Sequence, residues 1–198
     1  ECSYGYLNYE IVEEIVVDHF PRKADGFVYT ADEFAQAWAA RKGFHAADAV
    51  DYDALIEEFD MIRKVNDDEI DEFWLYAFPY AGYYESIMGG PGAFWCNAPQ
   101  LTQTARMKRR FIIMGFNYER GVGEALEAYG HRAESIMKYT FRDQRGDSNL
   151  WEKLWRYDVA NPGQAEVGWM HYAPNSERDY DWGNRRLVKS RWRTWQNF

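Results

Sequence analysis

The chain has 198 residues, of which 46% are hydrophobic, 28% are charged and 18% are aromatic. This length fits one compact domain, and this composition excludes a disordered chain, a collagen-like fibre and a small disulfide-stapled module. The formal net charge of -9 makes nucleic acid an unfavourable partner, because an acidic surface repels phosphate backbones.

The first part of the chain predicts one strand and two helices. Residues 11–17 form a β-branched run, which predicts a buried strand. Thr30 and Glu33 have the spacing of a capping box, so a helix should follow over about 31–41. Asp51 can cap a second helix. The apolar face of that second helix carries Leu55, Ile56, Phe59 and Ile62.

Three further apolar runs predict strands. The run at 73–78 is stopped by Pro79, and two others lie at 110–116 and 166–171. Helical patterns separate these runs along the chain. We therefore expect an α/β fold, with a mainly parallel β-sheet that carries helices on its faces.

A long helix should follow the strand at 110–116. Asn117 is a suitable N-cap for a helix over about 118–139, and Asn149 can begin another. No linker divides the chain, so we expect a single domain over 1–198. Its C-terminal segment, 183–198, is basic and rich in Trp and Arg. The longest apolar runs are too short to cross a bilayer, so no membrane span is expected.

Polar residues follow the predicted strands, where ligands of parallel sheets bind. Glu85 and Glu119 could be the two carboxylates that glycosidic bond cleavage needs. Asn117 and His171 would then bind the substrate. Aromatic rings suited to sugar stacking precede or follow Glu85, at Tyr80, Tyr83, Tyr84 and Trp95. The leading hypothesis is a carbohydrate-active hydrolase. A non-catalytic carbohydrate-binding or interaction module is an alternative, and the same rings could simply cover the sheet.

The helix at 118–139 supports a second alternative, a metal-dependent hydrolase. His131 offers a nitrogen ligand, and Glu127 or Glu134 offers oxygen. In the site that we expect, His131, Glu134 and His171 with one of two later aspartates would hold zinc or a similar ion that activates water. Those aspartates are Asp179 and Asp181, which with Asn184 could instead bind calcium. The charged stripe on this helix is also compatible with an ordinary solvent-facing surface held by i,i+4 ion pairs.

Two glycines interrupt the same helix. Gly123 and Gly130 are seven residues apart, and each costs about 1 kcal/mol in a helix interior. We therefore expect another chain segment to approach the helix backbone beside them. Such a segment could place His131 and Glu134 in a cleft.

Several stretches resemble an uncharacterised family of bacterial, secreted proteins. They are GFNYERG at 115–121, GE at 123–124, GHRAES at 130–135, and PN followed by DYDW at 174–182. The resemblance implies secretion but no activity, so it assigns no catalytic residue. The cysteines do not decide the compartment, because Cys2 and Cys96 could form a disulfide or remain two thiols.

Overall fold

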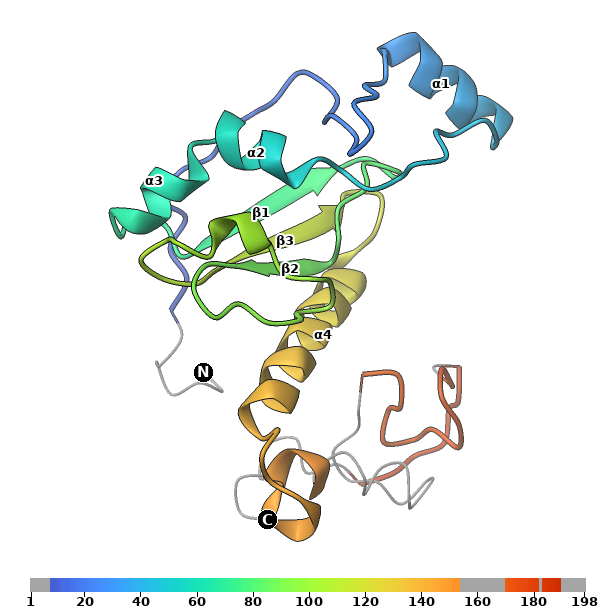
Figure 1. Ribbon diagram of the computed structural model, residues 1–198. Coiled ribbons are helices and arrows are strands. Elements are labelled where there is room, and N and C mark those ends of the chain that lie inside the picture. Colours follow the sequence, from blue (N-terminus) through green and yellow to red (C-terminus); the bar gives the residue numbers. More distant parts are fainter. Residues whose placement is uncertain (1–7, 154–169, 182, 190–198) are drawn as a thin grey trace. The chain divides into compact units, whose positions relative to one another are not determined.

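The computed structural model describes residues 8–153, 170–181 and 183–189 (Figure 1). The chain divides into two compact units, Glu1–Gly121 and Val122–Phe198, where we expected one domain. The first unit contains α1 (Ala31–Ala40), α2 (Tyr52–Glu58), α3 (Met61–Asn66), β1 (Glu72–Ala77), β2 (Ser86–Gly89), the 3-10 helix η1 (Thr102–Thr104) and β3 (Phe111–Asn117). The second contains α4 (Val122–Thr140) and the 3-10 helix η2 (Gly146–Ser148).

The sheet is small and mixed, so the predicted mainly parallel sheet with helices on its faces is wrong. Its strand order is β1-β3-β2, with β1 parallel to β3 and β2 antiparallel to it. The strands predicted at 73–78 and 110–116 are β1 and β3. The antiparallel strand β2 was not predicted. Most of the strand predicted at 166–171 lies outside the described residues.

The core of the first unit lies between the sheet and helices α2 and α3 (Figure 1). Phe73 on β1 pairs in register with Ile113 on β3, which pairs with Ile87 on β2. All three side chains are buried, and each contributes about 1.5–3 kcal/mol relative to an exposed position. They pack with Leu55, Ile56, Met61 and Val65 from the two helices. The face of the sheet that packs against α2 and α3 is therefore the buried one.

The predicted second helix is two helices. Asp60 adopts a left-handed backbone with φ of 51°, which ends α2 and begins α3. As a result Ile62 leaves the predicted apolar face and is 42% exposed.

The two predicted caps are confirmed. Thr30 and Glu33 form a complete capping box on α1, and Asp51 accepts a hydrogen bond from the Ala54 N–H at α2.

Replacing Asp51 with alanine should destabilise the first unit by about 1 kcal/mol, as loss of an N-cap generally does. The Ala54 N–H is the main cause that lowers the pKa of Asp51 below its ordinary value of 3.8. The stabilisation is therefore present above that value and is lost as the pH falls further. Urea denaturation of wild type and Asp51→Ala at neutral and acidic pH measures this. Equal loss of stability at both pH values would contradict it.

The predicted strand at 11–17 is wrong. This segment pairs with no other described strand, and Ile11 and Val16 are 86% and 89% exposed. Its β-branched side chains have strand propensity, but propensity cannot provide the hydrogen-bonded neighbour that a strand requires. In the described part of the chain, none of the helices is long and apolar enough for a membrane span.

A buried lysine ties together three loops of the first unit. The Lys23 side chain is 1% exposed, and its Nζ donates to the Asp48 carbonyl, the Asp48 carboxylate and the Tyr80 carbonyl. These acceptors neutralise and satisfy a charge that would otherwise be costly to bury. The Tyr80 backbone is held in the left-handed region there, with φ of 65°.

In the second unit, α4 begins at Val122, later than predicted. Asn117 does not cap it, because its side chain instead accepts a hydrogen bond from the Glu119 N–H in the preceding turn. Asn149 does begin a helical turn over 150–153, where its side chain accepts from the Glu152 N–H at 2.9 Å. Cys2 lies outside the described residues and Cys96 is buried.

Candidate metal centre

Helix α4 presents Glu127 and His131 on one face, because residues four apart lie one above the other on a helix. Both side chains are largely shielded from solvent, at 26% and 15% exposed. The third member of the group is His171, which comes from the loop after residue 170 and is 22% exposed. All three residues belong to the second unit.

A glycine on α4 allows the loop that carries His171 to approach the helix. A Cβ atom added at Gly130 would lie 2.0 Å from the Sδ atom of Met170, the residue before His171. The prediction that a segment approaches the helix backbone is therefore confirmed at Gly130. At Gly123 it is wrong, since a Cβ there would meet no atom within 4 Å.

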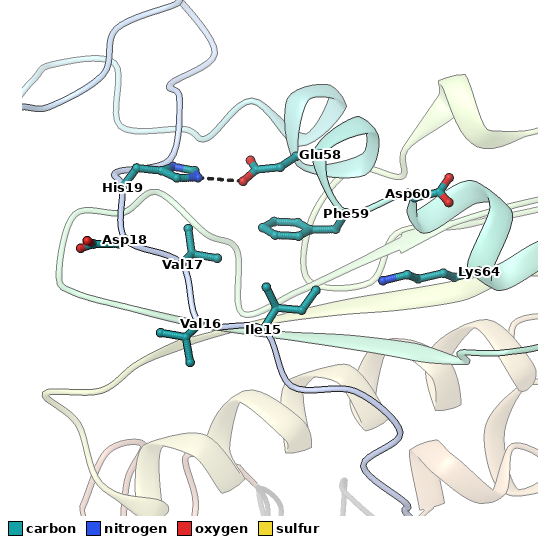
Figure 2. Close-up of a pocket in the computed structure, with 9 residues that line it drawn as sticks. All are labelled: Ile15, Val16, Val17, Asp18, His19, Glu58, Phe59, Asp60 and Lys64. Carbon is teal, nitrogen blue, oxygen red and sulfur yellow. Dashed lines mark ion pairs between the residues drawn. The ribbon is translucent and has the colours of Figure 1, made fainter.

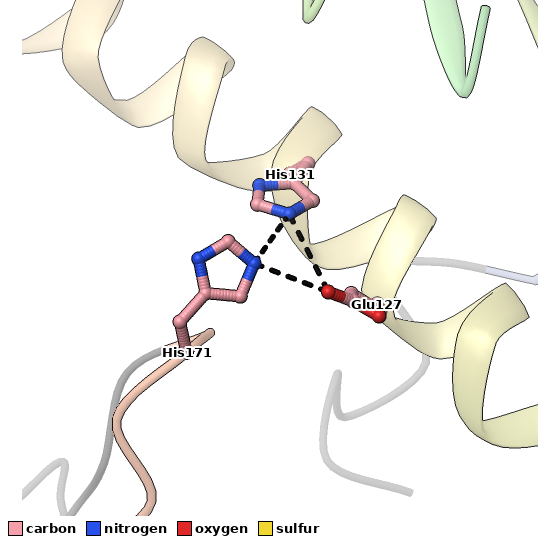
Figure 3. A group of neighbouring side chains, drawn as sticks. All are labelled: Glu127, His131 and His171. Atoms are coloured by element: carbon pink, nitrogen blue, oxygen red, sulfur yellow. Dashed lines mark hydrogen bonds and ion pairs between the residues drawn. The ribbon is translucent and has the colours of Figure 1, made fainter. Parts of the chain in front are cut away.

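The potential metal-ligand atoms of the three side chains lie close together (Figure 3). His131 Nε2 lies 3.0 Å from His171 Nε2 and 3.9 Å from Glu127 Oε1, and the last two atoms are 3.1 Å apart. The circle through these three atoms has a radius of about 2.0 Å, close to the bonds of about 2.0–2.2 Å that zinc makes with histidine and carboxylate. An ion near the centre of the circle would therefore reach all three atoms.

A carboxylate lies behind the His131 ring. His131 Nδ1 lies 3.2 Å from Glu134 Oε2. Glu134 can accept a hydrogen bond from an Nδ1–H group, and in that tautomer the Nε2 lone pair faces Glu127 and His171. Lys138 Nζ lies 2.5 Å from the other Glu134 oxygen and holds that carboxylate from its far side. Outer carboxylates of this kind orient metal-binding histidines.

Tyr180 supports His171. Its ring stacks on the imidazole with centroids 4.3 Å apart and planes 25° apart, and its N–H donates to the His171 carbonyl at 2.7 Å. The Tyr180 backbone is held in the left-handed region, with φ of 60°. Such a conformation is unfavourable for a bulky residue and persists where the surroundings impose it. The tyrosine thus restrains the orientation of a candidate ligand.

Without an ion, one proton can satisfy the cluster. A proton on His171 Nε2 can be donated to Glu127 Oε1 or to His131 Nε2, both of which lie within about 3 Å of it. A metal ion would take the place of that proton. Protons and metal therefore compete for the same atoms, and metal affinity should fall as the pH is lowered.

The two predicted aspartate ligands lie outside this group. Asp181 Oδ2 accepts hydrogen bonds from the Asn184 amide and the Glu177 N–H, which together lower the pKa of Asp181. It therefore organises the loop that carries His171. Asp179 is exposed and is not part of the cluster. Asn184 donates from its amide nitrogen to Asp181, and its Oδ1 accepts from the Arg186 N–H. Calcium binding by Asp179, Asp181 and Asn184 stays a prediction.

The predicted catalytic carboxylates lie elsewhere, in the first unit. Glu85 precedes β2 and its carbonyl accepts from the Gly115 N–H, whereas Asn117 ends β3 and Glu119 follows it. The Glu85 carboxylate accepts a hydrogen bond from the Asn97 amide at 2.5 Å. His171 belongs to the second unit, so the predicted rim that combined it with these residues is not a feature of either unit.

The predicted sugar-binding rings have mixed environments. Tyr80 is half-exposed and stacks on Phe44, and Tyr84 stacks on Tyr52. Trp95 is 59% exposed. Tyr83 packs against the core, and its burial raises its pKa to about 12. No binding role is assigned to these rings by the contacts that they make, and their part in sugar binding stays a prediction.

No protein-family model matches the chain, and no curated protein or solved structure matches it significantly. The resemblance to a family of secreted bacterial proteins therefore stays a prediction. The candidate metal centre rests on the geometry of the second unit.

Replacing Gly130 with glutamine should weaken zinc binding by about tenfold. The new side chain would have to push the Met170 side chain aside, since even a Cβ lies 2.0 Å from its sulfur, and the expected loss of affinity requires this shift to reach the adjacent ligand His171. The matched control is Gly123→Gln, which enters open space and should stabilise the helix by up to about 1 kcal/mol. Competition titrations with a coloured zinc chelator measure both. Equal affinities in the two variants would contradict the role of Gly130.

Proposed function

We propose that the protein binds a zinc-like ion through Glu127, His131 and His171 and uses it in a hydrolytic reaction. The observation that carries this proposal is the convergence of three ligand atoms on a circle of about 2.0 Å radius. Two imidazoles and one carboxylate with a further position open to water form a donor set used by catalytic zinc sites.

The donor set favours a transition metal over calcium or magnesium. Those hard cations take oxygen ligands, whereas two of the three candidate ligands here are imidazole nitrogens. Zinc, bound in this way, lowers the pKa of a water ligand to about 7 and polarises a substrate oxygen. Both effects assist the attack of water on an ester, amide, phosphoester or acetal.

Each residue of the cluster has a separate part in this proposal. His131 and His171 supply neutral nitrogen ligands, and Glu127 supplies the charged one. Glu134 accepts a hydrogen bond from His131 Nδ1–H and so favours the tautomer in which Nε2 can bind metal. Tyr180 restrains the His171 ring. The partial exposure of all three ligands supports access for a substrate.

The test begins with protein that carries no affinity tag and was purified without chelator. Elemental analysis and a competition titration should show one tightly bound zinc ion, with an affinity that falls as the pH is lowered. A panel of ester, amide, phosphoester and glycoside substrates should reveal turnover that dipicolinate removes and added zinc restores. No zinc binding at micromolar concentration would overturn the proposed centre. Zinc binding without chelator-sensitive turnover would overturn the hydrolase.

Glycosidic cleavage by Glu85 and Glu119 is a second candidate. It is favoured by the parallel pairing of β1 and β3, which brings the carboxyl ends of both strands to one edge of the sheet. The Gly115 N–H to Glu85 carbonyl bond brings the start of β2 to the same edge. Turnover of glycosides that resists dipicolinate but is lost in Glu85→Gln and Glu119→Gln would support this candidate over the metal-dependent one.

A further inference from the structure

Residues 10–18 of the first unit have an unpaired backbone. Their N–H and C=O groups form no hydrogen bond with any other described residue. The segment nevertheless has the composition of a strand, and its β-branched side chains are exposed. These side chains are Ile11, Val12, Ile15, Val16 and Val17. The segment is not a strand in this structure, but its unpaired backbone groups offer a template for another chain, as the exposed edge of a sheet does.

The segment is held in place at both ends and in the middle. The Tyr9 hydroxyl lies 3.3 Å from the Glu72 carboxylate on β1. Glu13 forms an ion pair of 2.5 Å with Lys64 on α3, and His19 pairs with Glu58 on α2 at 2.9 Å. The backbone edge is therefore fixed against the first unit before any partner arrives, which lowers the entropic cost of association.

A hollow of about 400 Å³ lies beside the segment (Figure 2). Ile15 and Val17 face Phe59, the C-cap residue of α2, across this hollow. Val16 also belongs to the lining, and its side chain is directed away from Phe59. Side chains thus alternate between two faces, as they do in a strand. The hollow can accept an apolar side chain from a neighbouring strand.

The segment and the hollow beside it carry more acidic than basic residues. Asp18, Glu58 and Asp60 line the hollow, and Glu10, Glu13 and Glu14 lie elsewhere on the segment. Glu58 pairs with His19 and Asp60 pairs with Arg63. The lining has one lysine, Lys64, and Glu13 already pairs with it. A second copy of the chain fits this surface poorly, because antiparallel self-pairing would bring Glu13 and Glu14 of the two copies together. A basic partner is complementary to it.

We propose that residues 10–18 bind an extended segment of another protein in which apolar and basic residues alternate. The partner adds as a β-strand and its backbone pairs with the free groups of the segment. One of its apolar side chains enters the hollow against Phe59, and its lysines or arginines face the carboxylates. This interaction is independent of the proposed metal centre in the second unit.

A fluorescent, blocked peptide of alternating Val and Lys tests the proposal against the full chain. Anisotropy titrations should show saturable binding that weakens with salt. Val16→Pro should weaken it at least about tenfold, because proline removes one backbone donor and disrupts strand pairing. Since Val16 is 89% exposed and its backbone bonds to no described residue, this variant should keep the wild-type melting temperature.

Two controls separate strand addition from simple charge attraction. A peptide with the same composition but with all lysines in one block should bind more weakly, and a Val–Glu peptide should not bind. Equal binding of the alternating and blocked peptides, or unchanged binding by Val16→Pro at wild-type stability, overturns the proposal. Sedimentation that shows a dimer lost in Val16→Pro also overturns it, because the occupant would then be a second copy.

Discussion

Replacing His171 with alanine should weaken zinc binding at least about 100-fold. The variant retains only Glu127 and His131, which are neighbours on one helix and cannot surround an ion by themselves. Because changes to outer partners of a metal site already cost about 10–100-fold, the loss of a direct ligand should cost more. Competition titration and elemental analysis of the purified variant measure the effect.

The matched control is His19→Ala, which removes a histidine from the first unit. His19 is 57% exposed and pairs with Glu58, so its loss should leave zinc affinity and stoichiometry unchanged. Circular dichroism should show that both variants keep the wild-type helix content without metal. If His171→Ala bound zinc as tightly as His19→Ala, the ion would have to lie outside the cluster.

Replacing Glu134 with alanine should weaken zinc binding about 10–100-fold, although Glu134 is not proposed to touch the ion. Its carboxylate can accept a hydrogen bond from His131 Nδ1–H and thereby direct the Nε2 lone pair to the cluster. Without this acceptor, the ring can rotate or adopt the other tautomer. Cobalt titration provides the readout, because the visible absorption of bound cobalt reports the ligand geometry.

The conservative variant Glu134→Gln separates orientation from helix stability. Its amide oxygen can still accept a hydrogen bond from Nδ1–H, so zinc affinity and the cobalt spectrum should stay close to wild type. Lys138→Ala should have a smaller effect than Glu134→Ala, since Lys138 contacts only the outer carboxylate oxygen. A cobalt spectrum that is identical in Glu134→Ala and wild type would rule out an orienting role.

Local signals in the sequence were sufficient to place several elements. The capping box of Thr30 and Glu33 and the cap at Asp51 act within three residues, so their geometry follows from spacing alone. The runs that became β1 and β3 were also recognisable, because each has enough consecutive apolar residues to form a buried strand. Asn149 acted as expected for the same local reason.

Pairing between distant segments could not be predicted in the same way. The run at 11–17 has strand propensity but no described ladder partner, whereas β2 is four residues long and ends in Gly89. That glycine is required because a Cβ there would lie 2.4 Å from the Phe111 ring, a contact that no local pattern reveals. Because the pairing of β2 with β3 could not be predicted from the sequence, the mixed character of the sheet could not be predicted either.

The candidate site was predictable in part. Helical spacing grouped Glu127, His131 and Glu134, and Gly130 correctly indicated that another segment approaches the helix. Which glutamate is a candidate ligand and which contacts His131 from behind depends on side-chain rotamers. These place Glu127 beside His171 and Glu134 beside His131 Nδ1. One of Asp179 and Asp181 was expected to join His171 as a ligand, and their absence from the cluster follows from the fold of the loop that carries all three residues.

The candidate ligands His131 and His171 are 40 residues apart, yet both belong to the second unit. An ion that binds only the folded unit would stabilise it by mass action and would leave the unfolded chain unconstrained. The stability of this unit would then depend on the free metal concentration, with a gain of about 2.7 kcal/mol at one hundred times the dissociation constant. Metal supply could thus regulate the lifetime of the folded protein as well as its chemistry.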